Sequence, residues 1–254
     1  MMDRVEVFRA LHVPGDPLVL FNIWDAGSAK AVAAAGAKAI ATGSYGVACA
    51  RGSSDGENLS LDEALANLGE ILGVTDLPVS IDMEAGYGAD AAAVGRSVAR
   101  ARRAGAAGIN IEDRLSGETE LLDRREAAGR IAAAAATGLF VNARCDTFRG
   151  RDATQDGREL VAATLERARA YADAGAGGLF VPFLADARCI AAICEGSPIP
   201  VNILWSKPCG DRAALAALGV ARISHGHQPW AAAMAWLGEQ AAAVLGGAVP
   251  PYAA

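Results

Sequence analysis

Charged side chains lie at the ends of several short apolar segments, and the acidic ones among them could bind a cation. Asp82 and Glu84 alternate with apolar residues at the end of one segment, Glu112 ends a second, and Arg144 ends a third. Burying several carboxylates together is costly unless a cation compensates, and one arginine cannot balance them all. Because hard divalent cations prefer oxygen ligands, the pattern predicts a site for Mg²⁺, or alternatively Mn²⁺. For any single acid the alternative is a helix cap or an ion pair with an arginine such as Arg114.

Polar residues end other apolar segments as well. Asn22 and Asn202 end two of them, and Asn202 is predicted to contact a bound substrate. Two of the three histidines, His225 and His227, follow a further segment. Because histidine titrates near neutral pH, either one could transfer a proton in a reaction. The alternative is that both only hydrogen-bond the start of the helix that follows.

Short Ala-Gly phrases divide the chain into similar units. They recur at Gly36, Gly105 and Gly175, with a looser copy at Gly138, and each ends an Ala-rich helical stretch before a short apolar run. Gly105 and Gly138 are 33 residues apart, and Gly138 and Gly175 are 37 residues apart. Each interval suits one strand, one helix and their loops, so the spacing indicates a repeated βα unit.

Eight apolar runs are predicted to be β-strands. They span 18–23, 38–42, 77–82, 107–112, 139–144, 177–181, 199–204 and 220–224. The intervening segments are long enough for helices, and those at 90–104 and 156–174 begin with an Asp that can cap a helix. Strands that alternate with helices form a parallel sheet, and this chain length predicts a single (β/α)₈ TIM barrel domain over 1–254. In such a barrel, functional side chains gather at the C-terminal ends of the strands.

Two other architectures fit the same length, namely two small α/β domains or one doubly wound sheet. No Pro- or Ser-rich linker divides the chain, which argues against two domains. A doubly wound sheet is expected to have a Gly-rich phosphate loop after its first strand, and residues 22–27 do not form one. The barrel is therefore the preferred fold.

An additional helix is predicted over 229–247. Its apolar residues, which include Trp230, Met234, Trp236 and Leu237, cover more than one face. This breadth favours burial on two sides, as in a helix that contacts or is exchanged with a second subunit. We therefore expect a homodimer or a homotetramer. The alternative is a final barrel helix with an Ala-rich exposed side.

Composition limits the classes of function. Hydrophobic residues make up 52% of the chain and charged residues 20%, which indicates a globular protein. The net charge of −6 and the lack of a basic run argue against binding to nucleic acid or an anionic membrane. No apolar run is long enough for a transmembrane helix, and the charged N-terminus does not resemble a signal peptide. Five scattered cysteines without a CxxC pair favour a cytoplasmic location.

A series of motifs resembles one known superfamily. The motifs are Thr-Gly-Ser-Tyr-Gly at 42–46, Asp-Gly-Glu at 55–57, Asp-Met-Glu-Ala-Gly-Tyr-Gly at 82–88, Asn-Ile-Glu-Asp at 110–113 and Asn-Ala-Arg-Cys-Asp at 142–146. In this order, and over roughly 18–229, the chain resembles the isocitrate lyase and phosphoenolpyruvate mutase superfamily.

The resemblance implies a Mg²⁺ site with one direct protein ligand. Asp82 would be that ligand, while Asp55, Glu84 and Glu112 would hold the metal through water molecules. The chemistry shared by the superfamily passes through a pyruvate enolate bound to Mg²⁺, which acts as a Lewis acid on the enolate oxygen.

The resemblance also implies how the substrate is held. Backbone N–H groups of Ser44, Tyr45 and Gly46 would bind the carboxylate of a pyruvyl unit, and Arg144 would bind the anionic end of the substrate. The candidate catalytic residues are Arg144, Glu112, His225 and His227.

One motif of the superfamily is missing. Members that cleave 2-hydroxy tricarboxylates have Lys-Lys-Cys-Gly in the loop after the fourth strand, with the Cys as acid and base, whereas the loop at 114–120 has no Cys. It also lacks the Lys and Asn that hold a phosphoryl group in phosphonomutases and phosphonopyruvate hydrolases. We therefore expect a Mg²⁺-dependent lyase or decarboxylase of a small 2-oxo or 2-hydroxy dicarboxylate. The alternatives are C–P bond chemistry on phosphonopyruvate or phosphoenolpyruvate, and non-catalytic metal-dependent binding of a small acid.

Overall fold

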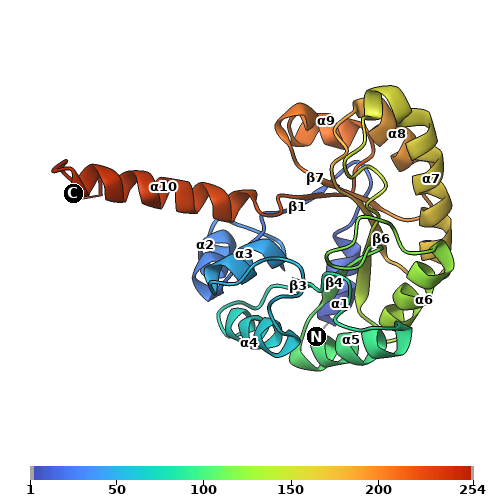
Figure 1. Cartoon of the computed structure of the whole chain (residues 1–254), viewed down its shortest axis with the longest axis horizontal. Coiled ribbons are helices and arrows are strands. Elements are labelled where there is room, and N and C mark those ends of the chain that lie inside the picture. The colour runs from blue at the N-terminus through green and yellow to red at the C-terminus, as the bar shows by residue number, and fades with distance from the viewer. Residues whose placement is uncertain (1–2, 253–254) are drawn as a thin grey trace.

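The computed structural model describes residues 3–252 and contains one eight-stranded parallel sheet (Figure 1). Its strands are β1 (Leu18–Leu20), β2 (Ile40–Ala41), β3 (Val79–Asp82), β4 (Gly108–Glu112), β5 (Phe140–Arg144), β6 (Gly178–Val181), β7 (Val201–Leu204) and β8 (Arg222–Ser224). From β2 to β8 each strand pairs with the next one in sequence, and β8 pairs with β1, whereas β1 and β2 form no ladder and a parallel bridge between Ile23 and Thr42 joins their ends. The predicted (β/α)₈ barrel is confirmed, and the doubly wound alternative is wrong.

Helices surround this sheet (Figure 1). They are α1 (Arg4–Ala10), α2 (Ala26–Ala34), α3 (Ser44–Ala50), α4 (Leu61–Leu72), α5 (Ala91–Ala104), α6 (Arg124–Ala135), α7 (Ala153–Asp173), α8 (Ala187–Gly196), the 3₁₀ helix η1 (Lys207–Cys209), α9 (Arg212–Ala217) and α10 (Gln228–Leu245). Consecutive helices from α4 to α8 pack against one another around the barrel. Among residues 3–252, no helix combines the length and the apolar character needed to cross a membrane.

Aspartates begin several of these helices. Asp90 caps α5 as predicted, since its carboxylate accepts a hydrogen bond from the backbone N–H of Ala93 at 2.8 Å. The predicted start of the next long helix at Asp156 is wrong, because α7 already begins at Ala153 with Asp152 as its cap. Asp156 lies in the first turn instead, where an acidic side chain also suits the helix dipole.

Helix α1 packs against the N-terminal ends of β4 and β5. The Phe8 and Phe140 rings meet edge to face at 5.3 Å, and the His12 ring stacks on Phe140 at 4.2 Å. Gly108 begins β4 beneath Phe8, and a Cβ atom there would lie only 2.7 Å from the ring, so the packing requires glycine. Burial lowers the pKa of His12 to about 3, with Arg222 adding to the effect, so the ring is neutral at physiological pH.

Helix α10 extends away from the barrel (Figure 1). Only Pro229, in its first turn, is buried, and Trp236 and Leu237 are each 53% exposed. The alternative prediction of a final barrel helix is therefore wrong. Beyond the first turn, large apolar side chains of α10 are exposed, namely Met234, Trp236, Leu237 and Leu245.

Candidate active site

A cavity of about 160 Å³ lies at the C-terminal ends of the strands. Its wall includes Asp82 at the end of β3, Asn110 on β4, Arg144 at the end of β5, Phe180 on β6 and Ser224 at the end of β8. These residues are far apart in the sequence, and the barrel brings them together because all its strands point the same way. This is the end of a (β/α)₈ barrel at which active sites are built.

A second cavity of about 530 Å³ adjoins the first, since Asp55 and Arg149 are part of both walls. Asp82 faces the first cavity, whereas Glu84 and Glu112 face the second. The four acids predicted to form the metal site therefore border two adjacent spaces.

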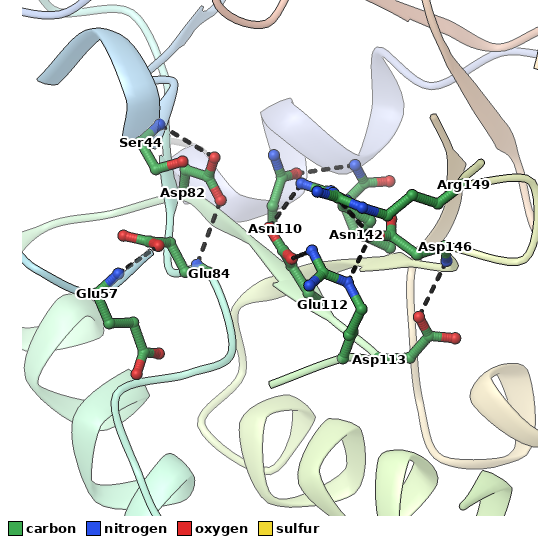
Figure 2. A network of polar contacts seen from close by, with 12 residues as sticks. Ser44, Glu57, Asp82, Glu84, Asn110, Glu112, Asp113, Asn142, Asp146 and Arg149 are labelled. Carbon is green, nitrogen blue, oxygen red and sulfur yellow. Dashed lines mark hydrogen bonds and ion pairs between the residues drawn. The ribbon is translucent and has the colours of Figure 1, made fainter. Parts of the chain in front are cut away.

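Asp82 forms hydrogen bonds with residues at the ends of β2 and β3 and at the start of α3. Its Oδ2 accepts a hydrogen bond from the backbone N–H of Ser44 at 3.1 Å, and its Oδ1 accepts one from that of Glu84 at 3.3 Å (Figure 2). Its own N–H donates to Oγ1 of Thr42 at 3.0 Å. Although part of its surface faces the cavity, Asp82 lies deep among protein atoms, and this burial raises its pKa against the opposing effect of Arg144.

Glu84 ties the loop that contains Asp55 to the end of β3. Its Oε2 accepts the backbone N–H of Glu57 at 2.6 Å, and its Oε1 accepts the Tyr87 hydroxyl at 3.3 Å. Glu57 in turn accepts the N–H of Tyr87 at 2.8 Å. Burial raises the pKa of Glu84 to about 7, and the negative charges of Asp82 and Asp55 add to the rise.

Backbone strain is concentrated at this end of the barrel. Within residues 3–252, the non-glycine residues with positive φ are Glu57, Glu84, Tyr87 and Phe183, with values from 48° to 64°. Glu84 and Phe183 line the two cavities, and Glu57 and Tyr87 contact Glu84. Conformations of this kind cost on the order of 1–3 kcal/mol each and persist mainly at functional sites.

Arg144 and Glu112 face each other across the ends of β5 and β4. Nη1 of Arg144 donates to Oε1 of Glu112 at 2.6 Å, while its Nε and Nη2 donate to the two oxygens of Asp146 at 2.6 and 3.0 Å. Burial raises the pKa of Glu112 to about 8 even beside Arg144. Burial alone would lower the pKa of Arg144, but Glu112 and Asp146 outweigh it, so the guanidinium stays charged.

A buried acid, Asp113, fixes the position of Asp146 and so of this ion pair. Asp113 accepts the backbone N–H of Asp146 at 2.9 Å, the Tyr171 hydroxyl at 2.7 Å and Nη1 of Arg167 at 3.2 Å. These bonds join β4, β5 and α7. They keep Asp146 in position to hold Arg144.

The predicted carboxylate-binding loop lies beside Asp82, at the start of α3. Ser44 and Tyr45 line the cavity, but the N–H of Ser44 already donates to Asp82. Gly46 is buried away from the cavity, where a Cβ atom would lie 3.3 Å from Trp230 and 3.4 Å from Trp24. Glycine therefore lets α3 pack closely against the first turn of α10.

The two histidines after β8 have different surroundings. His227 lines the cavity and meets the Tyr45 ring edge to face at 5.4 Å. The His225 ring instead stacks on Trp205 at 5.7 Å, and burial lowers its pKa. Of this pair, only His227 borders the cavity.

A polar network fills the barrel beneath the cavity. Oδ1 of Asn110 accepts hydrogen bonds from Nδ2 of Asn142 at 2.8 Å and from Nη2 of Arg222 at 3.3 Å. Asn202, predicted to contact substrate, is buried and exchanges hydrogen bonds with Ser224. The sequence analysis missed Arg222, although its alternation with Ala221 and Ile223 indicated a side chain that points into the barrel.

The acids fit a divalent cation by their chemistry. Asp55, Asp82, Glu84 and Glu112 supply hard oxygen donors, and the pKa values of the last three are raised. No three His, Cys, Asp or Glu side chains within 3–252 converge on a single ion position. A site with one direct carboxylate and water-mediated contacts needs no such convergence, and it stays a prediction.

Comparison with known proteins relates nearly the whole chain to one family. The family model described as phosphoenolpyruvate phosphomutase matches residues 8–245. The chain belongs to this family. The uncharacterised family relative Rv1998c of Mycobacterium tuberculosis is 39% identical over 248 residues, which cover 94% of this chain and 89% of that protein.

Two further relatives place the chain within the wider superfamily. The oxaloacetate decarboxylase of Pseudomonas savastanoi pv. phaseolicola is 30% identical over 91% of this chain and 81% of that protein. A crystal structure from Burkholderia cenocepacia J2315, provisionally named a phosphonomutase, is 46% identical, has a TM-score of 0.91, and matches 96% of this chain and 98% of that chain. The predicted membership of the isocitrate lyase and phosphoenolpyruvate mutase superfamily is confirmed, and the protein is an enzyme of its lyase class.

Proposed function

We propose that this enzyme uses Mg²⁺ to cleave a small 2-oxo or 2-hydroxy dicarboxylate and releases pyruvate or another 2-oxo acid. The supporting observation is the group of acids Asp82, Glu84 and Glu112, whose pKa values are raised beside two adjacent cavities at the C-terminal end of the barrel. Such acids favour a bound cation, because the cation offsets their mutual repulsion. The 30% identity to an oxaloacetate decarboxylase supports the choice of substrate class.

Loss of CO₂ from oxaloacetate illustrates the chemistry. The bond between C3 and C4 breaks, and its electron pair passes to the C2 oxygen to give the enolate of pyruvate. Mg²⁺, held by Asp82 and through water by Asp55, Glu84 and Glu112, would supply Lewis-acid stabilisation of that charge.

The protein's own groups supply the remaining steps. Arg144 adds positive charge beside the cavity and is kept in one orientation by its bonds to Glu112 and Asp146. A proton must then be added to C3, and His227 is the candidate donor because it lines the cavity.

Release of pyruvate tests the proposal. A coupled NADH assay would compare Mg²⁺ with EDTA over oxaloacetate, substituted malates, methylisocitrate and phosphonopyruvate, with enzyme-free oxaloacetate as the blank. We expect Mg²⁺-dependent turnover of a dicarboxylate. Release of inorganic phosphate from phosphonopyruvate would favour C–P bond chemistry, and oxalate binding without any turnover would favour a non-catalytic binding protein. The absence of both turnover and oxalate binding would contradict the proposed metal site.

We also propose that α10 packs against a second copy of the chain, as its apolar composition predicts. Met234, Trp236 and Leu237 on α10 are exposed. An apolar groove of about 690 Å³ runs along the outer side of β1 and α2, where Val19 and Phe21 are exposed too. Two exposed apolar surfaces of this kind favour association between two copies of the chain.

Trp236→Glu tests this association. The wild-type protein is expected to sediment as a dimer or a larger oligomer, and the variant to shift towards the monomer, because a charge replaces a large apolar contact. Glu239→Gln, on the same helix, is the matched control and should leave the mass unchanged. A monomeric wild-type protein would refute the proposal.

A further inference from the structure

Arg149 lies in the loop between β5 and α7, at the rim of the active site. It is part of the wall of both cavities. Its guanidinium lies 5.3 Å from the centre of the Phe183 ring, and its side chain is 48% exposed. Figure 2 shows Arg149 on the opposite side of the site from Ser44 and Asp82.

The hydrogen bonds of Arg144 leave it less available to a ligand than Arg149. Three nitrogens of Arg144 already donate to Glu112 and Asp146 at 2.6 to 3.0 Å. Across residues 3–252, by contrast, no oxygen accepts a hydrogen bond from the guanidinium of Arg149. The donors of Arg149 are therefore free to bind an anion.

The charge of Arg149 is also less neutralised than that of Arg144. Its nearest carboxylate oxygen is Oδ2 of Asp146, at 3.7 Å. That oxygen already accepts hydrogen bonds from Nη2 of Arg144 at 3.0 Å and Nε of Arg114 at 3.3 Å. Arg144 and Arg114 also pair with Glu112, at 2.6 and 3.7 Å. Asp146, by contrast, is the one carboxylate within 4 Å of Arg149 among residues 3–252, so the charge of Arg149 is the least neutralised of the three.

Phe183 supports Arg149 from the β6 side. It is 49% exposed, lines the cavity and adopts a φ of 64°, a conformation that strains a bulky residue. Arg144 also lies over this ring, at 5.9 Å. Cation–π contact of this kind favours a guanidinium that stays over the ring face and beside the cavity.

We propose that Arg149 binds the second anionic group of the substrate and thereby selects dianions over monoanions. The inference rests on the proposed function for one point, namely that the 2-oxo or 2-hydroxy acid end lies beside Asp82 and Ser44. A substrate anchored there extends across the cavity towards Arg149. A guanidinium matches a carboxylate geometrically because it can donate two parallel hydrogen bonds.

A binding experiment isolates the second anionic group. Calorimetric titration in Mg²⁺ would compare malate with 2-hydroxybutyrate, which has a methyl group where malate has its second carboxylate, and with oxalate as a probe of the metal end. The proteins are the wild type, Arg149→Gln and Arg149→Lys. Arg151→Gln is the matched control, since Arg151 lies in the same loop, pairs with Asp156 and is absent from both cavity walls.

We expect Arg149→Gln to weaken malate binding about 10- to 100-fold, the loss typical of a charge-assisted hydrogen bond. Binding of oxalate and 2-hydroxybutyrate should not change, Arg149→Lys should retain part of the malate affinity, and Arg151→Gln should match the wild type. Unchanged malate binding in Arg149→Gln would overturn the proposal, as would an equal loss for all three ligands.

Failure of the proposed function gives a different pattern. If oxalate does not bind even to the wild type, the metal-dependent acid site is wrong. A preference for malate that disappears in Arg149→Gln would still support the anion-binding role of Arg149 in that case. Absence of any preference in the wild type would overturn that role, whatever the result with oxalate.

Discussion

Asp82→Asn is expected to lower the Mg²⁺-dependent rate of pyruvate release by at least about 10³-fold, because several kcal/mol of transition-state stabilisation depend on the metal. Asparagine has nearly the same shape but no charge, so it would remove the predicted direct ligand without leaving a void. Ser44 and Glu84 each donate an N–H to one carboxylate oxygen. Asparagine has a single acceptor oxygen, so its NH₂ group would face one of these two donors. The measurement is kcat/KM for the best substrate of the pyruvate-release panel, with Mg²⁺ and with EDTA.

The stability of this variant separates a loss of chemistry from a loss of fold. Burial raises the pKa of Asp82, so its ionised form is unfavourable in the metal-free protein. Asp82→Asn relieves this cost but leaves one of the two N–H donors without its acceptor, so it should unfold in EDTA within a few degrees of the wild type. Asp90→Asn is the matched control, because asparagine also caps helices and Asp90 lies at the exposed start of α5. Activity of Asp82→Asn close to that of the wild type would exclude Asp82 as the essential ligand.

Metal-free protein is expected to lose stability as the pH rises towards 8. The pKa of Glu84 is about 7 in the folded protein against an ordinary value of 4.5, and that of Glu112 is about 8. Between the ordinary and the raised value, the folded state binds more protons than the unfolded state, so stability falls as pH rises through that window. For Glu84 alone the full loss is on the order of 3 kcal/mol. Mg²⁺ bound to the ionised acids, as proposed, would restore most of this stability at pH 8.

Glu84→Gln isolates the contribution of one acid. Glutamine can still accept the N–H of Glu57 and can donate to the Tyr87 hydroxyl, so the contacts of the loop are kept. In chemical denaturation with EDTA, the variant should match the wild type near pH 5 and exceed it at pH 8. Glu166→Gln, at an exposed position on α7, should show no such difference. If the free energies of unfolding of the wild type and Glu84→Gln change with pH in the same way from pH 5 to 8, the pKa of Glu84 is not raised in the metal-free protein.

The strands of the barrel could be predicted because each is an apolar run bounded by turn residues. The observed strands are shorter, as β1 shows, since it ends at Leu20 whereas the apolar run continues to Ile23. Beyond Leu20 the chain leaves the regular ladder and keeps only the bridge from Ile23 to Thr42. The direction of α10 could not be predicted, because an apolar helix suits burial against its own barrel as well as against a partner.

The grouping of Asp82, Glu84 and Glu112 at one end of the barrel could be predicted because parallel strands align the residues at their C-terminal ends, and their role in binding a metal stays a prediction. The loops were harder, since no periodic pattern places a loop side chain. Arg149 and Phe183 show the difficulty, because a phenylalanine gives no sign in the sequence that its backbone adopts a positive φ. Nor could the sequence distinguish His225 from His227, because they lie two residues apart and only the fold places His227 at the cavity and the His225 ring against Trp205.

The network beneath the cavity determines which atom Asn110 presents to a bound molecule. Both Asn142 and Arg222 donate to its Oδ1, so this oxygen is occupied on the side facing the interior of the barrel. The amide nitrogen is left for the cavity, whose wall includes Asn110. Asparagine can accept or donate, but here its orientation makes it a donor. An oxygen atom with growing negative charge would therefore find an N–H group beneath it that needs no rearrangement to form a hydrogen bond.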